Sequence, residues 1–433
     1  MRKSDPRDVP GGSSLGLAQF LSSNKPFIVV WLALFISIAG ICMVSPLLPV
    51  FAEDMGASGI WLGLTFSGFV FSQIPLMPIV GRLSDRFGKK FFLWFGLLIY
   101  AMAAVGYFWS PSYRELVLFR VLSGVGAAMV IPTAFAYIGD LAPHGSEGRY
   151  MGLFNIAMIA GLGIGPMLGG FIHDNLGTDA TFSSMAMLSI LGFVIVFLFL
   201  PKRTSSPRVT PPPGITQSTE HSSSLASMLR DASIKGIVAF QLVYGLLLST
   251  ALTFLGVWMR MVMGTAVVQI GIVLSARFIV NGIFSYPFGW LADRMNRVIF
   301  PSVGMAMVAI GTFFIPWIGS FALLVVLFTV IGIFESMAIP SVNAIAVDKG
   351  RDMGMGSVMA MSNMAQSLGL VIGSIAGGLV ESFMGIVAVF SCAAAFGFMG
   401  IVVFSVFILR STRFSNQSLA ELQPSTLDST FYE

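Results

Sequence analysis

Two short stretches of this sequence decide the fold, 81-GRLSDRFGKK-90 and 289-GWLADRMNR-297. Each follows a long apolar run, and the Gly-x-Leu-x-Asp-Arg core of the first recurs in the second after 208 residues (289 minus 81). The same offset superposes Gly124 on Gly332, Pro132 on Pro340, Asp140 on Asp348, Asn155 on Asn363, and glycines 161, 165, 169 and 170 on glycines 369, 373, 377 and 378. One offset that serves four separate segments indicates two related halves.

The composition is that of a membrane protein. Hydrophobic residues make up 56% of the 433 residues, charged residues only 10%, and the mean hydropathy is +0.87. A soluble protein would carry about a quarter charged residues, and here the deficit extends along the whole chain. Cys42 and Cys392 both lie in apolar runs, which excludes a disulfide framework.

The sequence also argues against several chemistries. It contains no Gly-x-x-x-x-Gly-Lys-[Ser/Thr] phosphate loop, which argues against transport driven by ATP within this chain. It contains no metal-ligand or nucleophile–base constellation, and the three histidines fall in loops or at helix ends. We therefore expect a protein that is not an enzyme, with no metal, no cofactor and no nucleic acid partner.

Twelve apolar runs are long enough to span a bilayer, because a spanning helix needs about 20 mostly apolar residues. They lie near 27–51, 59–80, 91–110, 115–138, 150–172, 181–200, 236–258, 267–288, 298–317, 320–343, 355–380 and 385–409. Irregular backbone cannot face lipid, so these runs must be helices. Six per half is an even number, so both halves point the same way. We predict an all-α membrane protein of twelve transmembrane helices, in two six-helix bundles related by a parallel pseudo-repeat.

Lysine and arginine set the orientation. With the N-terminus in the cytoplasm, cytoplasmic segments hold 20 of the 24 Lys and Arg residues, and external loops hold only Arg114 and Arg260. This bias predicts a multi-pass protein of the plasma (inner) membrane with both termini in the cytoplasm. The domains are then a cytoplasmic tail at 1–25, a bundle at 26–200, a cytoplasmic linker at 201–235, a bundle at 236–409 and a cytoplasmic tail at 410–433.

The 81–90 loop resembles the G-x-L-a-D-r-x-G-r-k signature of the major facilitator superfamily, with a degenerate copy at 289–297. The resemblance covers residues 25–410. A basic loop that only obeys the positive-inside rule would explain the Lys and Arg residues but not the repeated Gly and Asp. The resemblance implies two charge clusters that hold the cytoplasmic side shut. They comprise Gly81, Asp85, Arg86, Lys89 and Asp140 in the first half, and Asp293, Arg297 and Asp348 in the second.

Two residues of the first cluster, Gly81 and Asp85, have a physical role in such a gate. Gly81 would permit close approach of a neighbouring helix. Asp85 would lie near the cytoplasmic start of the 355–380 helix, whose positive dipole end favours a carboxylate. We interpret the clusters as gate latches and not as substrate contacts.

The run 150–172 carries Gly161-x-x-x-Gly165-Pro166-x-x-Gly169-Gly170. This pattern is similar to the motif of the proton-coupled exporters of the superfamily. Small residues every four positions allow tight helix packing, and proline bends a helix. The alternative is a packing seam without directional meaning.

The end of the first run, Ser45-Pro46-Leu-Leu-Pro49, looks like the corresponding segment of the twelve-helix drug:proton antiporter family. Some members of that family place a carboxylate within the first helix. This chain has none between Lys25 and Glu53, so their proton site cannot be transferred to it.

Three charged residues lie deep in the predicted spans, Arg120, Arg277 and Glu335. Arg120 belongs to a stretch that resembles the family's motif with an intramembrane arginine, although Ser123 stands where the family usually has glutamine. A charge inside a span is expensive and usually functional. Glu335 is the candidate for proton coupling, together with Arg277 and Arg120. The alternatives are a structural Arg277–Glu335 pair and an Arg120 that bonds carbonyls of neighbouring helices.

The family resemblance implies a substrate cavity lined by the first, fourth, seventh and tenth helices. Its polar candidates, besides the buried charges, are Ser37, Ser123, Gln241 and Tyr244. Gln241 and Tyr244 are three residues apart and therefore share a helix face. The excess of positive charge within the spans, two to one, hints at anionic or neutral cargo.

We predict a secondary active transporter, a proton-coupled exporter of small hydrophobic or amphipathic organic compounds that works by alternating access. Its partners would be the small-molecule substrate, protons and the lipid bilayer, and we expect a monomer. One alternative is an uptake carrier or uniporter for a small metabolite. Another is a membrane sensor or scaffold that does not transport, against which the latch residues in both halves argue.

The orientation is directly testable. A tag at the C-terminus or within 205–225 should be inaccessible to an impermeant reagent on intact cells, because the positive-inside bias places both segments in the cytoplasm. Labelling should appear only after the membrane is permeabilised. Labelling of either tag on intact cells would overturn the topology.

Overall fold

The computed structural model describes residues 25–142, 147–201, 228, 230–292 and 294–421. In chain order the helices are α2 (Lys25–Val44), α3 (Leu48–Asp54), α4 (Ile60–Phe87), α5 (Lys89–Phe108), α6 (Tyr113–Leu141), α7 (Glu147–Leu176), α8 (Thr178–Phe199), α10 (Ala232–Met263), α11 (Val267–Ala292), α12 (Ile299–Phe314), the short 3-10 helix η1 (Ile315–Trp317), α13 (Phe321–Met353), α14 (Met355–Met384) and α15 (Ile386–Glu421). Within these described ranges, twelve helical spans are long and apolar enough to cross a membrane. This confirms the predicted twelve-helix, all-α fold.

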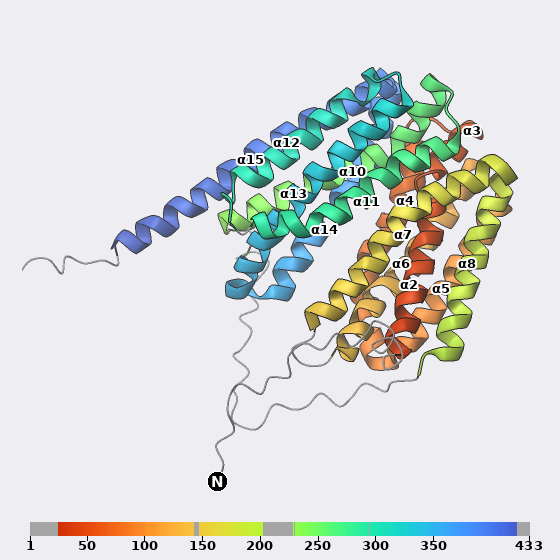
Figure 1. Cartoon of the computed structure of the whole chain (residues 1–433), viewed down its shortest axis with the longest axis horizontal. Coiled ribbons are helices and arrows are strands. Elements are labelled where there is room, and N and C mark those ends of the chain that lie inside the picture. Colours follow the sequence, from red (N-terminus) through yellow and green to blue (C-terminus); the bar gives the residue numbers. More distant parts are fainter. Residues whose placement is uncertain (1–24, 143–146, 202–227, 229, 293, 422–433) are drawn as a thin grey trace, which may run out of the picture.

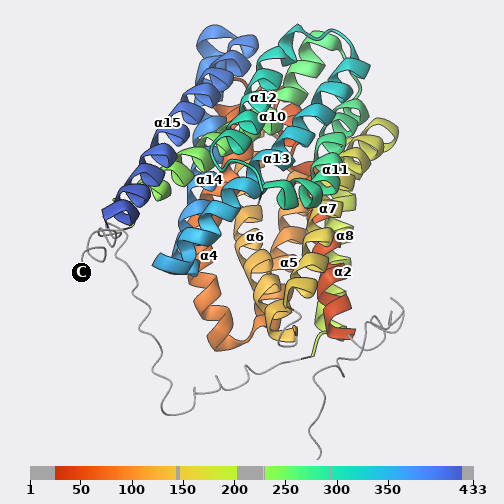
Figure 2. The ribbon, with the colours of Figure 1, turned by 60° about the vertical axis from the view of Figure 1, so that its left-hand side comes forward.

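The helices form two bundles of six spans, α2 to α8 and α10 to α15 (Figures 1 and 2). The bundles meet along two pairs of helices, α7 with α11 and α4 with α14. Under the offset of 208 residues, α4 corresponds to α11 and α7 to α14. The two contacts are therefore the same contact made twice, as a parallel repeat requires.

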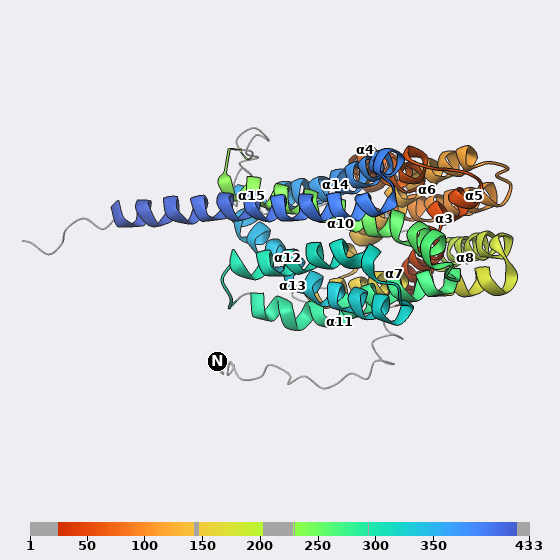
Figure 3. The same cartoon turned by 90° about the horizontal axis from the view of Figure 1, so that it is seen from above.

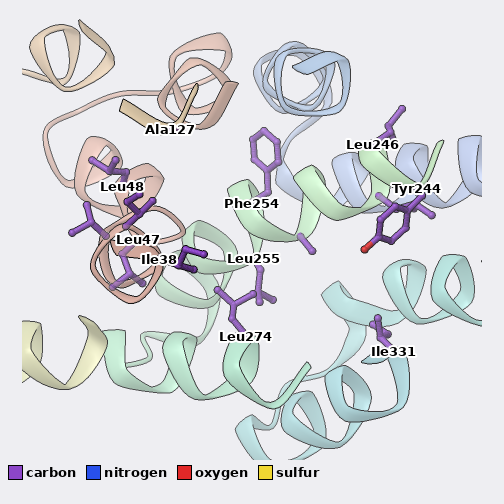
Figure 4. Close-up of a cluster of buried hydrophobic side chains, with 14 of the residues drawn as sticks. Ile38, Leu47, Leu48, Ala127, Tyr244, Leu246, Phe254, Leu255, Leu274 and Ile331 are labelled. Carbon is purple, nitrogen blue, oxygen red and sulfur yellow. The ribbon is translucent and has the colours of Figure 1, made fainter. Parts of the chain in front are cut away.

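The bundles are in contact at one end and diverge towards the other (Figures 1 and 2). We call the end with the loops 55–59, 109–112, 264–266 and 318–320 the closed end, and the opposite end the open end. Among the described residues, the hydrogen bonds and ion pairs that join the bundles lie in the half nearest the closed end. One apolar cluster crosses the interface there, with Ile38, Leu47 and Leu48 of the first bundle opposite Leu255 and Leu274 of the second (Figure 4).

Two helix boundaries differ from the hydropathy pattern. The first run, expected as one helix, ends as α2 at Val44 and resumes as α3 at Leu48, because Pro46 has no N–H to continue the helical ladder. The last run continues as α15 to Glu421, beyond residue 409 where the tail was expected to begin (Figure 3). Residues 1–24 of the predicted N-terminal tail and residues 202–227 and 229 of the predicted linker lie outside the described residues. Helix α10 begins at Ala232, within the span 201–235 that was expected to be linker.

The glycines of α7 let two other helices approach its backbone. A methyl group on Gly161 would lie 2.7 Å from Ile38 Cγ2, and one on Gly165 would lie 2.8 Å from both the Ala39 carbonyl oxygen and Cys42 Cβ. Both neighbours belong to α2 of the same bundle. Gly170 instead faces the other bundle, at the start of α11. The motif thus packs α7 against α2 on one face and against α11 on another.

This packing predicts unequal effects of two substitutions in α7. Gly165→Leu should lower the melting temperature in detergent and impair transport, because the Ala39 and Cys42 atoms leave no volume for a side chain; overpacking of this kind costs about 1–3 kcal/mol or more. Leu162→Ile, a partly buried residue three positions away, is the volume-conserving control and should cost less than about 1.5 kcal/mol. Equal, mild effects would show that the seam tolerates added volume.

Candidate functional site

A buried ion pair joins two helices of the second bundle. Arg277 of α11 donates from Nε to Glu335 Oε2 at 2.9 Å and from Nη2 to Glu335 Oε1 at 3.1 Å. Both side chains are only 2% exposed. Gly332, one turn before Glu335 on α13, allows the close approach, since a methyl group there would lie 2.5 Å from the Arg277 carbonyl oxygen. The bidentate geometry fixes both side chains and shields both charges.

A third helix contributes to the carboxylate. The hydroxyl of Tyr244, on α10, donates to Glu335 Oε1. One turn nearer the open end, Gln241 donates from Nε2 to Asn343 Oδ1 of α13 at 3.3 Å. Asn343 is exposed, and Gln241 Oε1 is buried and without a hydrogen-bond partner among the described residues. A column of polar side chains therefore leads from Glu335 towards the open end.

Arg120 is buried in the first bundle, at 1% exposure. Its Nη2 donates to the hydroxyl of Ser45, at the break between α2 and α3. Its guanidinium carbon lies 4.6 Å from the ring centroid of Phe69 and 6.0 Å from that of Phe66, both on α4. Hydroxyl and ring contacts thus surround this charge, and Nε is without a hydrogen-bond partner in the described part of the chain. The structure does not bring Arg120 into the Arg277–Glu335 pair.

The two serines expected in a substrate cavity lie in different surroundings. Ser123 is fully buried, with its hydroxyl 2.7 Å from that of Tyr107 on α5 and donating to the Phe119 carbonyl at 3.1 Å. Because α5 packs against helices of its own bundle, Ser123 faces the bundle interior and not the interface. Ser37 is also buried, and its hydroxyl has no hydrogen-bond partner within the described ranges.

At the open end the structure brings together residues of each expected gate cluster. Lys89 Nζ lies 2.5 Å from Asp140 Oδ2 and 3.8 Å from Asp85 Oδ1. In the second bundle Arg297 pairs with Asp348. These pairs are repeat counterparts, since 89 and 140 become 297 and 348 under the offset of 208. Asp293 lies outside the described residues.

In the described conformation no neighbouring helix approaches Gly81. Apart from the residues of α4 around it, no described atom lies within 4 Å of a methyl group built on Gly81, and the Asp85 side chain is 66% exposed. Arg86 lies over the ring of Phe87, 5.5 Å from its centroid. The reason is the divergence of the bundles, which removes the neighbour that Gly81 would admit.

Sequence reasoning missed two carboxylates at the closed end. Asp174, at the end of α7, accepts hydrogen bonds from the backbone N–H groups of Val267 and Val268 in the other bundle. Glu381, at the end of α14, accepts one from Gly59 N at 2.6 Å. A signal for them was present, because an acidic residue ends each of the two glycine-rich helices that the repeat makes equivalent.

The fold and its repeat define a secondary-transporter architecture with two bundles around a central axis. The family model of the Major Facilitator Superfamily matches the chain twice, over residues 30–267 and 239–428. The chain belongs to the major facilitator superfamily, which confirms the resemblance of the 81–90 loop. It is therefore an integral, multi-pass membrane transporter and not an enzyme.

Known relatives are similar over different lengths. An uncharacterized MFS-type transporter of Methanocaldococcus jannaschii is 24% identical over 401 residues, 90% of this chain and 99% of the relative. The quinolone resistance protein NorA of Staphylococcus aureus is 31% identical over 185 residues, 42% of this chain and only 47% of NorA. Among solved structures, an inward-facing, unoccupied bacterial homologue of the human lysosomal transporter Spinster has a TM-score of 0.71 at 15% identity, over 92% of this chain and 97% of that one.

The buried ion pair can be tested by a double-mutant cycle. Arg277→Met should lower stability by about 3–5 kcal/mol, because it leaves the Glu335 carboxylate buried and uncompensated. The double variant Arg277→Met with Glu335→Leu should recover most of the loss, since no charge remains in the apolar site. Thermal unfolding of the purified protein in detergent measures both.

A matched control is Arg260→Met, which breaks the exposed Arg260–Asp54 ion pair at the closed end. It should change stability by no more than about 1 kcal/mol. If the double variant is as unstable as Arg277→Met alone, the loss comes from packing around Arg277 and not from the charge.

Proposed function

We propose that the protein is a proton-coupled exporter of small hydrophobic or amphipathic organic compounds that works by alternating access. It acts as a monomer in the plasma (inner) membrane, with both termini in the cytoplasm. The orientation rests on the 20 to 2 distribution of Lys and Arg residues. In that orientation the open end faces the cytoplasm, and the described conformation is the one that loads cargo from inside the cell.

The observation that carries the proton coupling is the buried carboxylate of Glu335. It is 2% exposed and bound by Arg277 and Tyr244. Protonation would neutralise Glu335, free the Arg277 guanidinium and leave the site with one net positive charge. A carboxyl group in such a site can exist in two states that differ by one buried charge, which is what a coupling group requires.

A route for the proton to the open end is supported by the polar side chains that follow. Tyr244 contacts Glu335, Gln241 lies one turn further along α10, and its partner Asn343 is exposed. When the closed end opens instead, Glu335 would exchange its proton with the other side. Inward proton flow would then drive the substrate outward.

Substrate recognition is assigned to polar groups that lack protein partners. Gln241 Oε1 and the Ser37 hydroxyl are buried acceptors without a hydrogen-bond partner in the described chain. Each could bind a polar group of the cargo at little desolvation cost beyond that already incurred. Aromatic and aliphatic side chains around them would hold the apolar part of the cargo. Arg120, with its unpartnered Nε, is a further candidate to contact cargo or influence coupling.

The open-end clusters are assigned the role of the cytoplasmic gate. Lys89 with Asp140 and Asp85 lies at the open end of the first bundle, and Arg297 with Asp348 at the open end of the second. Closure of the open end would bring Asp85 towards the first turn of α14, where unsatisfied N–H groups favour a carboxylate. Gly81 would then admit the approaching helix.

The direction of transport is supported by two features. The Gly161 to Gly170 pattern of α7 is complete, and one relative over part of the chain is described as a quinolone resistance protein. Neither determines the cargo. If the protein instead imported a small metabolite, the substrate would accumulate inside the cell, in the same direction as the inward proton flow.

The decisive experiment is Glu335→Gln, which keeps the shape of the side chain and removes its titration. In proteoliposomes with an imposed pH gradient, the neutral hydrophobic dyes Nile red and N-phenyl-1-naphthylamine serve as fluorescent cargo. We expect uphill, proton-driven transport to be lost, while downhill exchange of the same dyes remains measurable. Proton release on addition of dye to the purified protein should disappear as well.

Glu53→Gln is the matched control, because it removes a carboxylate from the end of α3 and leaves the ion pair intact. Its uphill transport should equal that of the unmodified protein. If Glu335→Gln still exports against a gradient with the usual pH dependence, the coupling group lies elsewhere and Glu335 is a structural partner of Arg277.

A further inference from the structure

Two carboxylates bind helix starts in the opposite bundle at the closed end. Asp174 Oδ1 lies 3.1 Å from Val267 N and Asp174 Oδ2 lies 2.7 Å from Val268 N, at the first turn of α11. Glu381 Oε2 lies 2.6 Å from Gly59 N, at the N-cap of α4. Each acid ends one helix and caps another across the interface between the bundles.

The two caps are related by the internal repeat. Under the offset of 208 residues Gly59 corresponds to Val267, so the two capped positions are equivalent. The counterpart of Asp174 is Ser382, and Glu381 stands one position before it. The additional methylene of glutamate makes up for this shift. Two different acids at unequal positions thus cap equivalent helix starts, Asp174 with two hydrogen bonds and Glu381 with one.

The capped groups need such partners. The first N–H groups of a helix have no acceptor within the helix, and the positive end of the helix dipole favours an anion. Gly59 caps α4 without a side chain of its own. When the bundles separate, water can replace the carboxylates at these groups. The interaction therefore stabilises the closed end without making its opening prohibitive.

The caps can form only because two glycines let the helix backbones of opposite bundles approach closely. A methyl group on Gly170 would lie 2.6 Å from the Val267 carbonyl oxygen, and one on Gly378 would lie 2.5 Å from that of Gly59. These glycines are repeat counterparts and lie one turn before the two acids. Backbone contact between the bundles thus brings each carboxylate within reach of the helix start that it caps.

Neighbouring groups at this end contribute differently. The His173 ring stacks on Phe51 with centroids 5.2 Å apart, and its Nδ1 lies 3.1 Å from Asp174 Oδ1, which orients that carboxylate. The ion pair between Asp54 and Arg260 also joins the bundles, at 3.6 Å, but its side chains are 43% and 36% exposed. Water screens such a pair strongly.

We propose that Asp174 and Glu381 are the paired latches of the closed end, and that together they set the equilibrium between the described conformation and one open on the opposite side. The proposal goes beyond the transport cycle assigned above, because it depends neither on the coupling ion nor on the cargo. Glu335 lies 14 residues into α13, about 21 Å along the helix from this end. The latches therefore act apart from the ion pair.

The test measures the opening of the closed end directly. Pro111 and Gly319 are repeat counterparts, both exposed in loops of opposite bundles at the closed end. Spin labels at Pro111→Cys and Gly319→Cys, in a background with Cys42→Ala and Cys392→Ala, report the distance between the bundles by double electron–electron resonance. The protein is studied at full length in nanodiscs, without added cargo.

Asp174→Ala and Glu381→Ala should each shift the population from the short to the long distance by about fivefold, the effect of losing one side-chain cap. The double variant should shift it further. Asp174→Asn should shift it less than Asp174→Ala, because the amide oxygen still accepts a hydrogen bond from one N–H group. These variants keep the fold if each elutes as a single species with unchanged helical circular dichroism.

Asp179→Asn is the matched control, since this exposed acid begins α8 at the same end and has no partner in the other bundle among the described residues. It should leave the distance distribution unchanged. The proposal is overturned if the double alanine variant keeps the original distribution, or if the control shifts it equally. If Glu335→Gln has normal proton coupling while the Asp174 and Glu381 variants still shift the distance distribution, the proposed coupling site is wrong and the latch proposal stands. The two proposals can therefore fail independently.

Discussion

Backbone contact between helices of opposite bundles is the interaction on which the rest of this structure depends. Lipid chains are as apolar as leucine, so helices in a bilayer associate through packing and polar contacts and not through hydrophobic burial. Here Gly63 of α4 meets the Ser374 carbonyl of α14, and Gly271 of α11 meets the Pro166 carbonyl of α7. The repeat makes these contacts equivalent. Together with the polar and apolar contacts at the closed end, they join the two bundles and leave the opposite end free to diverge.

That arrangement gives the two ends of the molecule different electrostatics. At the open end the charged groups pair within each bundle, as Lys89 does with Asp140 and Arg297 with Asp348. At the closed end carboxylates bind helix starts across the interface. The proposed alternating access would exchange which end is shut, and an interface with two discrete packings suits such a transition better than a continuously deformable one.

Buried charge is concentrated in few places, each with its own compensation. The Arg277–Glu335 pair is satisfied by two mutual hydrogen bonds and the Tyr244 hydroxyl. Arg120 has the Ser45 hydroxyl and the face of Phe69 instead. Removal of one partner of the Arg277–Glu335 pair would leave the other charge buried and unpaired. The second bundle thus holds a mutually compensated ion pair, and the first holds an arginine with neutral partners.

The sequence by itself determined the fold and much of the local chemistry. Hydropathy gave the twelve spans, because only helices satisfy their backbone in lipid, and the offset of 208 residues gave the two halves. The opposite charges of Arg277 and Glu335, both deep in predicted spans, already indicated a possible ion pair.

Only the tertiary structure decided which end is shut, that Ser123 faces α5, and that Asp174 and Glu381 cap helices of the other bundle. The physical reason is that periodicity fixes depth and face along one helix. Which helices become neighbours, and in which of two packings the bundles rest, depends on contacts between residues far apart in the chain.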